Sequence, residues 1–508
     1  MDWGQALSGF DNRSFHIRIA PSVMSTTLPF ASATVQAAWI REGATTSASL
    51  TEAHLARIRQ HNTALNAIVV SNEAGAQAEA RNHDAEREQG MASGPLHGVP
   101  VTVKESYNLA GFPTTVNFPQ LEGNIATTDA FVVSRLRAAG AIILGKTNIP
   151  TMLGDFQSFG PLYPTAANPY DTTRTPGGST GGGAAALAAG LTSLEFGSDI
   201  GGSIRLPAHF CGLFGLKPTE NALKHGEGHV PPAPGARGGV VHMASMGPLA
   251  RTMADIELAW TVINAPTWHY LRHMPQRPPT NRLLGDYRIG WFTRAGPIEA
   301  GDDTKAVLRT FLQRLEGAGV ACEERRLPET WWNAAYDVWG AIFGTMMGQD
   351  APWIARQFMK RQFAAMGRGA LMQGAAALRR ALGMNLVDFA RALGRRTALI
   401  EELNRQFDDV DFLVSPVAAG PAFAHNPKHE PIAFEGRSEA YMDYVAPFTI
   451  AYNTCGNPVL VVPAGRSPEG LPIGLQIAAA QYAEPELLRF GRLVEALGAA
   501  SFVPPAGY

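Results

Sequence analysis

Short apolar runs alternate with longer segments of helical periodicity along the first part of the chain. Residues 101–104, 141–145 and 191–196 form the apolar runs, and their length is typical of buried strands. This alternation predicts an α/β fold built on a large, mixed, mostly parallel and twisted sheet, with helices on both faces and catalytic loops at the strand ends. Helices are predicted at residues 32–41, 49–61, 72–88, 130–139 and 183–189.

The second half of the chain predicts further strands of the same sheet. Residues 286–292 and 410–416 are short apolar runs. Residues 456–480 predict two strands joined by a turn rich in Gly and Pro. The sheet is therefore expected to use segments from both halves of the chain.

The sequence contains no segment typical of a linker between domains, which favours a single domain. Residues 218–245 are rich in Gly, Pro and His and predict a surface excursion rather than a boundary. We expect a single domain over residues 24–508, with a catalytic core at about 70–250, preceded by an N-terminal extension of residues 1–23.

Residues 330–400 differ from the rest of the chain in composition. They contain four tryptophans, six methionines and nine basic residues between Arg356 and Arg396, where Asp388 is the single acid. Three interpretations remain open. The stretch is a helical cap whose adaptable side chains line a substrate pocket, a set of core-packing helices, or a basic surface that binds a membrane.

Composition excludes several classes of function. The net charge of −2 gives no excess of Lys and Arg for nucleic-acid phosphates. Three cysteines, at 211, 322 and 455, favour a reducing compartment over a disulfide framework. Because the chain has no apolar run of membrane-spanning length and no secretory leader pattern, we expect a cytoplasmic protein without a membrane partner.

Two serines in glycine-rich loops, 24 positions apart, and one upstream lysine are the candidates for chemistry. Ser203 lies in GSDIGGSIR, residues 197–205. Consecutive glycines let successive backbone N–H groups turn toward one point, and such a nest can bind the oxyanion of a tetrahedral intermediate. Taken alone, the loop could equally be a tight glycine turn with an exposed serine.

Ser179 and Lys104 complete the set. Ser179 lies in PGGSTGG and also matches the G-x-S-x-G pattern of α/β-hydrolases, which glycine-rich loops meet easily. A nucleotide-binding loop is not expected, since G-x-x-x-x-G-K-[ST] is absent. Lys104 closes an apolar run, which predicts burial at a strand end. Burial lowers the pKa of a lysine, and only a neutral amine can accept a serine proton.

Together these segments resemble the amidase signature family. The likeness rests on GVPVTVKES at 98–106, GGSTGGG at 177–183, GSDIGGSIRLPA at 197–208 and GLFGLKPT at 212–219, and it extends to the C-terminal GNPVLVVPAG and LPIGLQI. It implies the amidase signature fold with a helical cap insertion. It also implies a serine amidase of broad specificity, similar to aryl acylamidases and urethanases, that needs no metal or cofactor.

The resemblance implies a role for each matching residue. Ser203 corresponds to the nucleophile, Lys104 to the base, and Ser179 to a bridging serine that follows a cis peptide bond after Gly178. The proton of Ser203 would pass through Ser179 to Lys104, and water would later cleave the acyl-enzyme by the reverse relay. The implied oxyanion donors are the backbone N–H groups of Ile200, Gly201, Gly202 and Ser203. The implied supporting residues are Gly178, Thr180, Asp199 and Arg205.

Three positions depart from the family pattern. Glu105 stands where Asp is common, and Thr180 stands where a second Ser is frequent. Neither change removes a reacting atom, so we expect activity to survive both. Thr151 stands where the family often has an acid, so that loop gives no guide to the substrate.

The leading hypothesis is hydrolysis of small or medium apolar amides, including aryl amides, with carbamates and esters as further substrates. Three alternatives are kept. The chain could be the glutamine-hydrolysing amidase subunit of a tRNA amidotransferase, or a non-enzymatic binding protein on the same scaffold. It could also be an α/β-hydrolase that uses Ser179 with Asp411 and His425 or His429. Homodimers are common in the family, although no feature of this sequence demands one.

Overall fold

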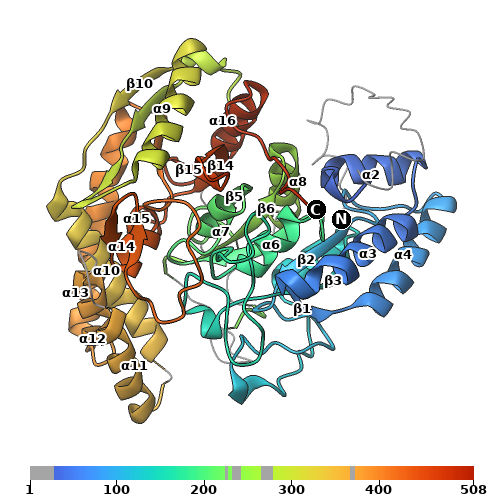
Figure 1. Cartoon of the computed structure of the whole chain (residues 1–508), viewed down its shortest axis with the longest axis horizontal. Coiled ribbons are helices and arrows are strands. Elements are labelled where there is room, and N and C mark those ends of the chain that lie inside the picture. The colour runs from blue at the N-terminus through green and yellow to red at the C-terminus, as the bar shows by residue number, and fades with distance from the viewer. Residues whose placement is uncertain (1–27, 224–226, 231–241, 265–277, 350, 367–371) are drawn as a thin grey trace.

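The computed structural model describes residues 28–223, 227–230, 242–264, 278–349, 351–366 and 372–508. One 11-stranded sheet runs through the molecule in the order β1-β3-β2-β4-β6-β5-β14-β15-β11-β7-β10 (Figure 1). Two short hairpins, β8–β9 and β12–β13, lie outside it. The strands are β1 (Ile68–Ser71), β2 (Pro100–Lys104), β3 (Ile142–Thr147), β4 (Glu195–Asp199), β5 (Phe214–Lys217), β6 (Ser245–Ala250), β7 (Arg288–Trp291), β8 (Arg294–Ala295), β9 (Ile298–Glu299), β10 (Ala321–Glu324), β11 (Phe412–Pro416), β12 (Ile432–Phe434), β13 (Arg437–Glu439), β14 (Val459–Arg466) and β15 (Pro472–Ala478).

The sheet is mixed, as predicted, but it is not mostly parallel. Among the described residues, β2 is parallel to β3 and β4, and β7 is parallel to β10 and β11. The other neighbouring pairs of the sheet are antiparallel. The connection between β14 and β15 is too short for a crossover helix, so these strands pair as a hairpin. β5 and β6, which the sequence analysis did not predict, add further antiparallel pairs at the centre.

The two faces of the sheet are buried against separate groups of helices. Along β14, Leu460 and Val462 pack into one hydrophobic core and Val459 and Val461 into the other, because successive strand side chains point to opposite faces. Helices on both faces are therefore confirmed. The first core takes in α2 (Ala33–Glu42), α5 (Phe131–Ala138), α8 (Met253–Ile263), α9 (Asp302–Gly317) and α16 (Glu484–Ala496). The second takes in α6 (Gly181–Ala188), α7 (Arg205–Phe210), α14 (Tyr441–Val445) and α15 (Pro447–Cys455), together with helices of the segment described next.

Four helices between β10 and β11 form the cap, which Figure 1 shows at the left of the molecule. Small residues shape its central contact. A Cβ added at Gly340 would lie 2.3 Å from the carbonyl oxygen of Gly374, and one at Gly344 would lie 2.7 Å from the Cβ of Ala381. Two helices therefore approach each other more closely than larger side chains would allow. The cap helices are α10 (Glu329–Gly348), α11 (Trp353–Met366), α12 (Met372–Ala381) and α13 (Leu386–Asn404).

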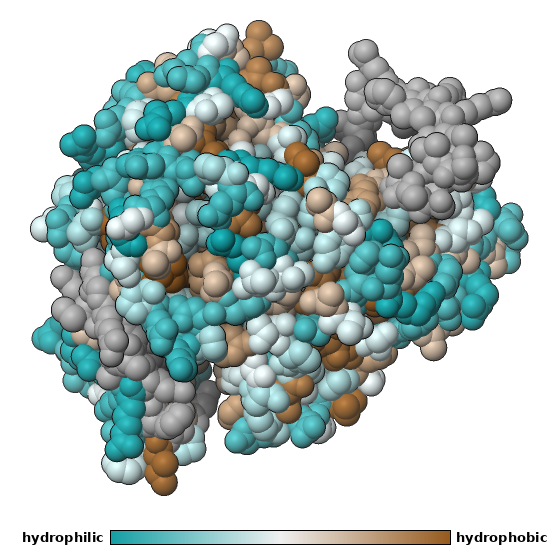
Figure 2. Space-filling model, in the orientation of Figure 1, coloured by the Kyte–Doolittle hydropathy of each residue, from teal (hydrophilic) through white to brown (hydrophobic). Residues whose placement is uncertain are grey.

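The far end of the cap exposes apolar side chains. Figure 2 shows hydrophobic surface at the lower tip. Ile354, near the start of α11, is 76% exposed, and Leu386, at the start of α13, is 81% exposed. No helix in the described ranges has the length and apolar character needed to span a bilayer.

The N-terminal helices cover the β1–β3 edge of the sheet. They are α3 (Ser47–Leu65) and α4 (Glu73–Glu88), which Figure 1 shows on the right. Ala76 and Ala80 of α4 pack with Leu55 of α3 and with Ile142 and Leu144 of β3. Single 3₁₀ turns occur at Leu28–Phe30, Pro119–Leu121, Thr151–Leu153, Leu284–Asp286 and Arg405–Asp408.

The predicted helices α2 to α6 and the predicted strands β2, β3, β7, β11, β14 and β15 are all found, with end shifts of a few residues. The strand predicted at 191–196 begins later, at Glu195, because it pairs with β2 from that residue and extends into the second glycine loop. The excursion predicted at 218–245 is wrong at both ends, since Thr219 and Glu220 are buried and Ser245 begins β6. Residues 1–23 lie outside the described residues.

Candidate active site

Lys104 is the last residue of β2, at the carboxyl end of a central parallel strand. β3 and β4 flank β2, and the lysine side chain is fully buried between them and the loops above. Its Nζ lies 2.7 Å from Ser179 Oγ, 3.2 Å from Ser198 Oγ and 3.3 Å from the Ser198 carbonyl oxygen. The predicted lysine and the first predicted serine are therefore in direct contact.

The surroundings of Lys104 favour its neutral form. Burial lowers the pKa of Lys104 to about 7, although the charges of Asp199 and Glu195 act in the opposite direction. Within the described ranges, no carboxylate oxygen lies at ion-pair distance from this amine. A neutral amine has two N–H donors and one lone pair. The two oxygens of Ser198 can accept the N–H groups, which leaves the lone pair for the hydroxyl proton of Ser179.

Ser179 lies just before α6, in the first glycine loop. The peptide bond between Gly178 and Ser179 is cis, as the family resemblance implies. A Cβ added at Gly178 would lie 2.7 Å from the backbone nitrogen of Gln157 and 2.7 Å from the carbonyl carbon of Phe156. Position 178 therefore has room only for glycine, because the adjacent backbone cannot yield as a flexible side chain would.

Ser203 lies in the turn between β4 and α7 and is 6% exposed. In the part of the chain that the structure describes, the N–H groups of Ile200, Gly201 and Ser203 donate no hydrogen bond. The Gly202 N–H donates to Asp199 Oδ1 at 2.8 Å. The prediction of four oxyanion donors is therefore corrected to three free donors, because the Asp199 carboxylate occupies the fourth.

Asp199 and Arg205 form a fully buried ion pair beneath this loop. Arg205 donates from Nε to Asp199 Oδ2 at 3.0 Å and from Nη2 to Oδ1 at 2.9 Å. Burial alone would raise the pKa of Asp199, but the Arg205 guanidinium holds it below its usual range. The predicted supporting role of both residues agrees with these contacts.

Two residues of α15 complete the network, and sequence reasoning missed both. Asn453 Nδ2 donates to Asp199 Oδ1 at 3.0 Å, and Thr449 Oγ1 donates to the carbonyl oxygen of Gly201 at 2.6 Å. Thr449 lies 246 positions after Ser203 in a helix of ordinary composition. No local signal in the sequence marks either residue, since their roles arise only when α15 packs against the loop.

The two serine loops meet through Thr180. Its backbone N–H donates to the carbonyl oxygen of Ser203 at 3.2 Å. Its Oγ1 is buried without a hydrogen-bond partner among the described residues, so the predicted supporting role of Thr180 rests on its backbone N–H and not on its hydroxyl. The threonine side chain instead fills the space beside Gly197, where a Cβ would lie 2.6 Å from Thr180 Oγ1. Nor does a hydrogen bond join the hydroxyls of Ser179 and Ser203 in the described part of the chain.

Glu195, at the start of β4, is a second buried acid that the sequence analysis did not single out. Thr102 Oγ1 donates to Glu195 Oε2 at 2.5 Å, and Thr147 Oγ1 donates to Glu195 Oε1 at 2.8 Å. Burial raises the pKa of Glu195 to about 8, so the carboxyl is largely neutral at pH 7. Glu195 and Lys104 thus share one low-dielectric environment at the carboxyl end of β2.

Glu105, one of the departures from the family pattern, is held by hydrogen bonds from the loop that follows β2. Its Oε1 accepts hydrogen bonds from Thr115 N–H at 2.6 Å and from Tyr163 OH at 3.0 Å, and its Oε2 accepts from Val116 N–H at 2.9 Å. The side chain therefore anchors the loop after β2.

Aromatic side chains flank the free N–H groups of the second loop. The indole N–H of Trp339, from α10 of the cap, donates to the Ile200 carbonyl oxygen at 2.8 Å. A Cβ at Gly201 would lie 3.5 Å from both the Trp339 ring and the Phe156 ring. We call Phe156 and Trp339 the aromatic wall. The cap thus contacts the candidate site directly.

The α/β-hydrolase alternative is wrong. Asp411 pairs with Arg282, with 2.8 Å between Oδ2 and Nη2. Neither His425 nor His429 contacts Ser179 or Asp411 in the described part of the chain. A Ser–His–Asp arrangement on Ser179 is therefore not assembled. Nor, among the residues described at this site, do three metal-ligating side chains come close enough to share an ion.

Known proteins resemble this chain in sequence and in fold. The amidase family model matches residues 49–488. Indoleacetamide hydrolase of Bradyrhizobium diazoefficiens is 32% identical over 89% of this chain and 84% of its own length. A glutamyl-tRNA(Gln) amidotransferase subunit of Chloroflexus aggregans is 33% identical over 88% of this chain and 92% of its own. The solved structure of 6-aminohexanoate cyclic dimer hydrolase complexed with substrate superimposes on this chain with a TM-score of 0.75. The two sequences are 25% identical, and the match covers 94% of this chain and 99% of that one.

Proposed function

The chain belongs to the amidase family, whose enzymes hydrolyse amides, and on this premise we propose that it cleaves the C–N bonds of small or medium apolar amides through a Ser203 acyl-enzyme. One observation carries the proposal. Lys104 Nζ lies 2.7 Å from Ser179 Oγ in a fully buried place, next to a loop with three free N–H groups among the described residues. A neutral base, a bridging hydroxyl and oxyanion donors are the parts that an amide hydrolase of this kind requires.

The acylation step uses the proton relay. Neutral Lys104 accepts the proton of Ser179, Ser179 accepts the proton of Ser203, and Ser203 Oγ forms a bond to the substrate carbonyl carbon. For this transfer the two serine hydroxyls must come within hydrogen-bonding distance of each other. The pKa of Lys104 near 7 matches the task, because the amine can both take and return the proton near neutral pH.

The tetrahedral intermediate is held by the backbone. Its oxyanion accepts hydrogen bonds from the N–H groups of Ile200, Gly201 and Ser203, each worth about 3 kcal/mol in the barrier. Protonation of the leaving amine through Ser179 breaks the C–N bond. Water then attacks the acyl-enzyme, and its proton returns along the same path, so that the acid leaves and Ser203 regains its hydroxyl.

The aromatic wall supports an apolar, often aryl, substrate. Phe156 and Trp339 lie beside Gly201, where the acyl or leaving group of a bound amide would rest. The related indoleacetamide hydrolase is named for an amide with an aromatic ring. A carbamate or an ester presents the same carbonyl to the same groups, so we extend the proposal to aryl carbamates and esters.

A hydrolysis panel tests the proposal. The panel contains an aliphatic amide, an aryl anilide, an aryl carbamate, an aryl ester and glutamine, each measured with the wild type and with Ser203→Ala. We expect turnover of the apolar substrates and its loss in the variant. Activity that survives Ser203→Ala would overturn the assignment of the nucleophile.

The amidotransferase role is the second candidate, because a component of such an enzyme is among the similar proteins at 33% identity. A chain in that role would hydrolyse glutamine in the presence of partner chains. Turnover of glutamine together with no turnover of apolar amides would favour this second candidate. Turnover of anilides by the isolated chain would favour the first.

A further inference from the structure

Away from the active site, three side chains form a compact group of metal-ligand type. His83 and Glu86 are one turn apart on α4, and His97 lies in the loop that leads into β2. One ligand atom from each residue lies within 4.8 Å of the other two, and in the described ranges this is the sole such group of three His, Cys, Asp or Glu residues. α4 lies at the edge of the molecule opposite the cap (Figure 1).

The distances between the ligand atoms are close to those of a shared ion. His83 Nδ1 lies 3.0 Å from Glu86 Oε2, and His97 Nδ1 lies 3.9 Å from the same oxygen. The two imidazole rings are 4.5 Å apart, edge to face. Ligands bound to one tetrahedral ion at about 2.0–2.1 Å are separated by little more than 3 Å, so a shift of at most about 1.5 Å closes the site.

The orientation of His97 supports metal binding by an independent route. His97 Nε2 lies 3.0 Å from the carbonyl oxygen of His83, and a carbonyl can only accept. Nε2 therefore carries the proton, and the lone pair is on Nδ1, which faces Glu86. The Ser93 N–H also points to this Nδ1 at 3.4 Å, a long contact that an ion could replace. Histidines that bind metals typically donate their other N–H to a carbonyl or a carboxylate in this way.

We propose that His83, Glu86 and His97 form a binding site for a divalent transition-metal ion of the Zn²⁺ class. Two imidazoles and one carboxylate are the ligand set that suits Zn²⁺, and three protein ligands leave a fourth position for water. Glu86 is 43% exposed, which gives the ion a route from solvent, whereas the His97 side chain is 8% exposed and is held in place.

The ion would join α4 to the start of β2. His97 lies seven residues before Lys104, and the intervening segment enters the centre of the sheet directly. Binding would therefore stabilise the fold at the strand that positions the lysine, without contact with the reacting atoms. The metal site is separate from the proposed reacting atoms and does not depend on the proposed amide hydrolysis.

The test uses the full chain without a histidine tag, freed of metal by chelation. Zn²⁺ is titrated against a chromophoric chelator, Co²⁺ is added as a spectroscopic probe, and Tm is measured with and without Zn²⁺. We expect one Zn²⁺ per chain, visible Co²⁺ absorption of tetrahedral type, and a rise in Tm on addition of Zn²⁺. His97→Gln should weaken binding by at least about tenfold and abolish the Tm rise.

Two further variants keep the test decisive. Glu86→Gln replaces a partly exposed ligand, so this variant should fold even where His97→Gln does not. It should also weaken Zn²⁺ binding. Glu88→Gln, on the exposed face of the same helix, is the matched control and should bind as the wild type does. Absence of saturable binding, or equal binding by all variants, would overturn the proposal, whereas amide hydrolysis is expected to be unchanged throughout.

Discussion

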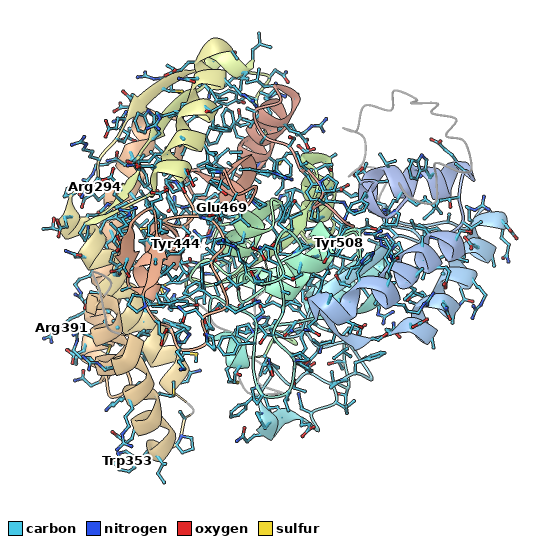
Figure 3. The ribbon with its side chains drawn as sticks, viewed as in Figure 1. Arg294, Trp353, Arg391, Tyr444, Glu469 and Tyr508 are labelled. Carbon is cyan, nitrogen blue, oxygen red and sulfur yellow. The ribbon has the colours of Figure 1, made fainter. Side chains whose placement is uncertain are left out.

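The candidate active site and the cap differ in where their charged and apolar side chains lie, buried in one region and exposed in the other. At the site, Asp199 and Arg205 are both fully buried and bond to each other. In the cap, Asp337 pairs with Arg380 and Arg395, whose side chains are more than half exposed. Figure 3 shows Trp353 standing at the far tip of the cap, 71% exposed, whereas Tyr444 lies within the body of the molecule.

The difference shows what holds each region in place. The site depends on the direction of hydrogen bonds, since a buried charge without its partner is costly. The cap depends more on shape, since α10 and α12 approach closely through small residues, and the ion pair between Asp337 and Arg380 that also joins them is partly exposed. Substitutions that are severe in one region are therefore expected to be mild in the other, and the following experiments test that asymmetry.

The largest expected effect is on chemistry. Lys104→Ala removes the proposed base, and we expect kcat to fall by about 10⁴-fold or more, because members of a relay act as a unit. Lys146 is the matched control, since it is also buried and donates to Thr114 Oγ1 at 2.8 Å, away from the serines. Lys146→Ala should lower stability while the folded fraction keeps most of its activity. Equal loss of kcat in both variants would contradict the relay.

The second effect is on stability. Asp199→Asn leaves the Arg205 charge buried without its counter-ion, and we expect a loss of about 3–5 kcal/mol in the free energy of unfolding. Asp337→Asn breaks partly exposed ion pairs of the cap and should cost less than about 1 kcal/mol. Denaturant unfolding of both variants measures the contrast. Similar losses would show that the two regions do not differ in this respect.

The third prediction concerns packing, to which the cap should be the more sensitive region. Gly344→Leu places a large side chain where even an added Cβ would lie only 2.7 Å from the Cβ of Ala381. Overpacking of this kind costs about 1–3 kcal/mol in the free energy of unfolding. Gly394, in α13, is the control because a Cβ there meets no described atom within 4 Å. Gly394→Ala should raise stability by about 0.5–1 kcal/mol, since alanine favours the helix. Thermal unfolding distinguishes the two signs.

A smaller effect is expected at the contact between the two regions. Trp339→Phe keeps a ring of the aromatic wall but removes the indole N–H that donates to the Ile200 carbonyl oxygen. We expect kcat/KM for an aryl amide to fall by about tenfold, the equivalent of one hydrogen bond. Trp331→Phe is the matched control, because its buried indole N–H has no partner among the described residues. A larger loss with Trp331→Phe would place the important contact elsewhere in the cap.

The smallest effect concerns pH. The relay needs neutral Lys104, whose pKa is about 7, so kcat/KM should rise with pH through that value and be lost below it. The Glu195 charge raises the pKa of Lys104, so Glu195→Gln should move this limb to lower pH. The shift should be less than about one unit, because Glu195 is itself largely neutral near pH 7. Asp337→Asn, distant in the cap, should leave the profile unchanged.

The sequence predicted the parts of the site whose chemistry is local. Lys104 ends an apolar run, and Ser179 and Ser203 stand in loops whose glycines mark unusual backbone, so the sequence singled them out as candidates, and the family resemblance supplied the role expected of each. Glu195, Thr449 and Asn453 carry no such mark. Their roles depend on which distant segments of the chain pack together. The periodicity of hydrophobic residues within one segment does not determine that packing.

The helices and strands likewise divide into those that the local sequence predicted and those that depend on packing with distant segments. Helices with several turns, such as α3 and α4, were predicted because their pattern repeats within the segment. β5 and β6 are short and contain Gly or Pro, so their place in the sheet follows from their neighbours rather than from their own sequence. Strand direction was misjudged for the same reason, since it depends on the connections and not on the strands themselves.

The position of the cap in the chain has an evolutionary consequence. Its four helices form one uninterrupted insertion between β10 and β11, two strands that both pair with β7 in parallel. A lineage could lengthen, shorten or replace this insertion by recombination at two points and leave the nucleophile and its base untouched. On the proposal that Trp339 of the cap helps to select the substrate, exchange of this one segment would change the substrate range, and a chimera made at those two junctions is expected to show the preference of its donor.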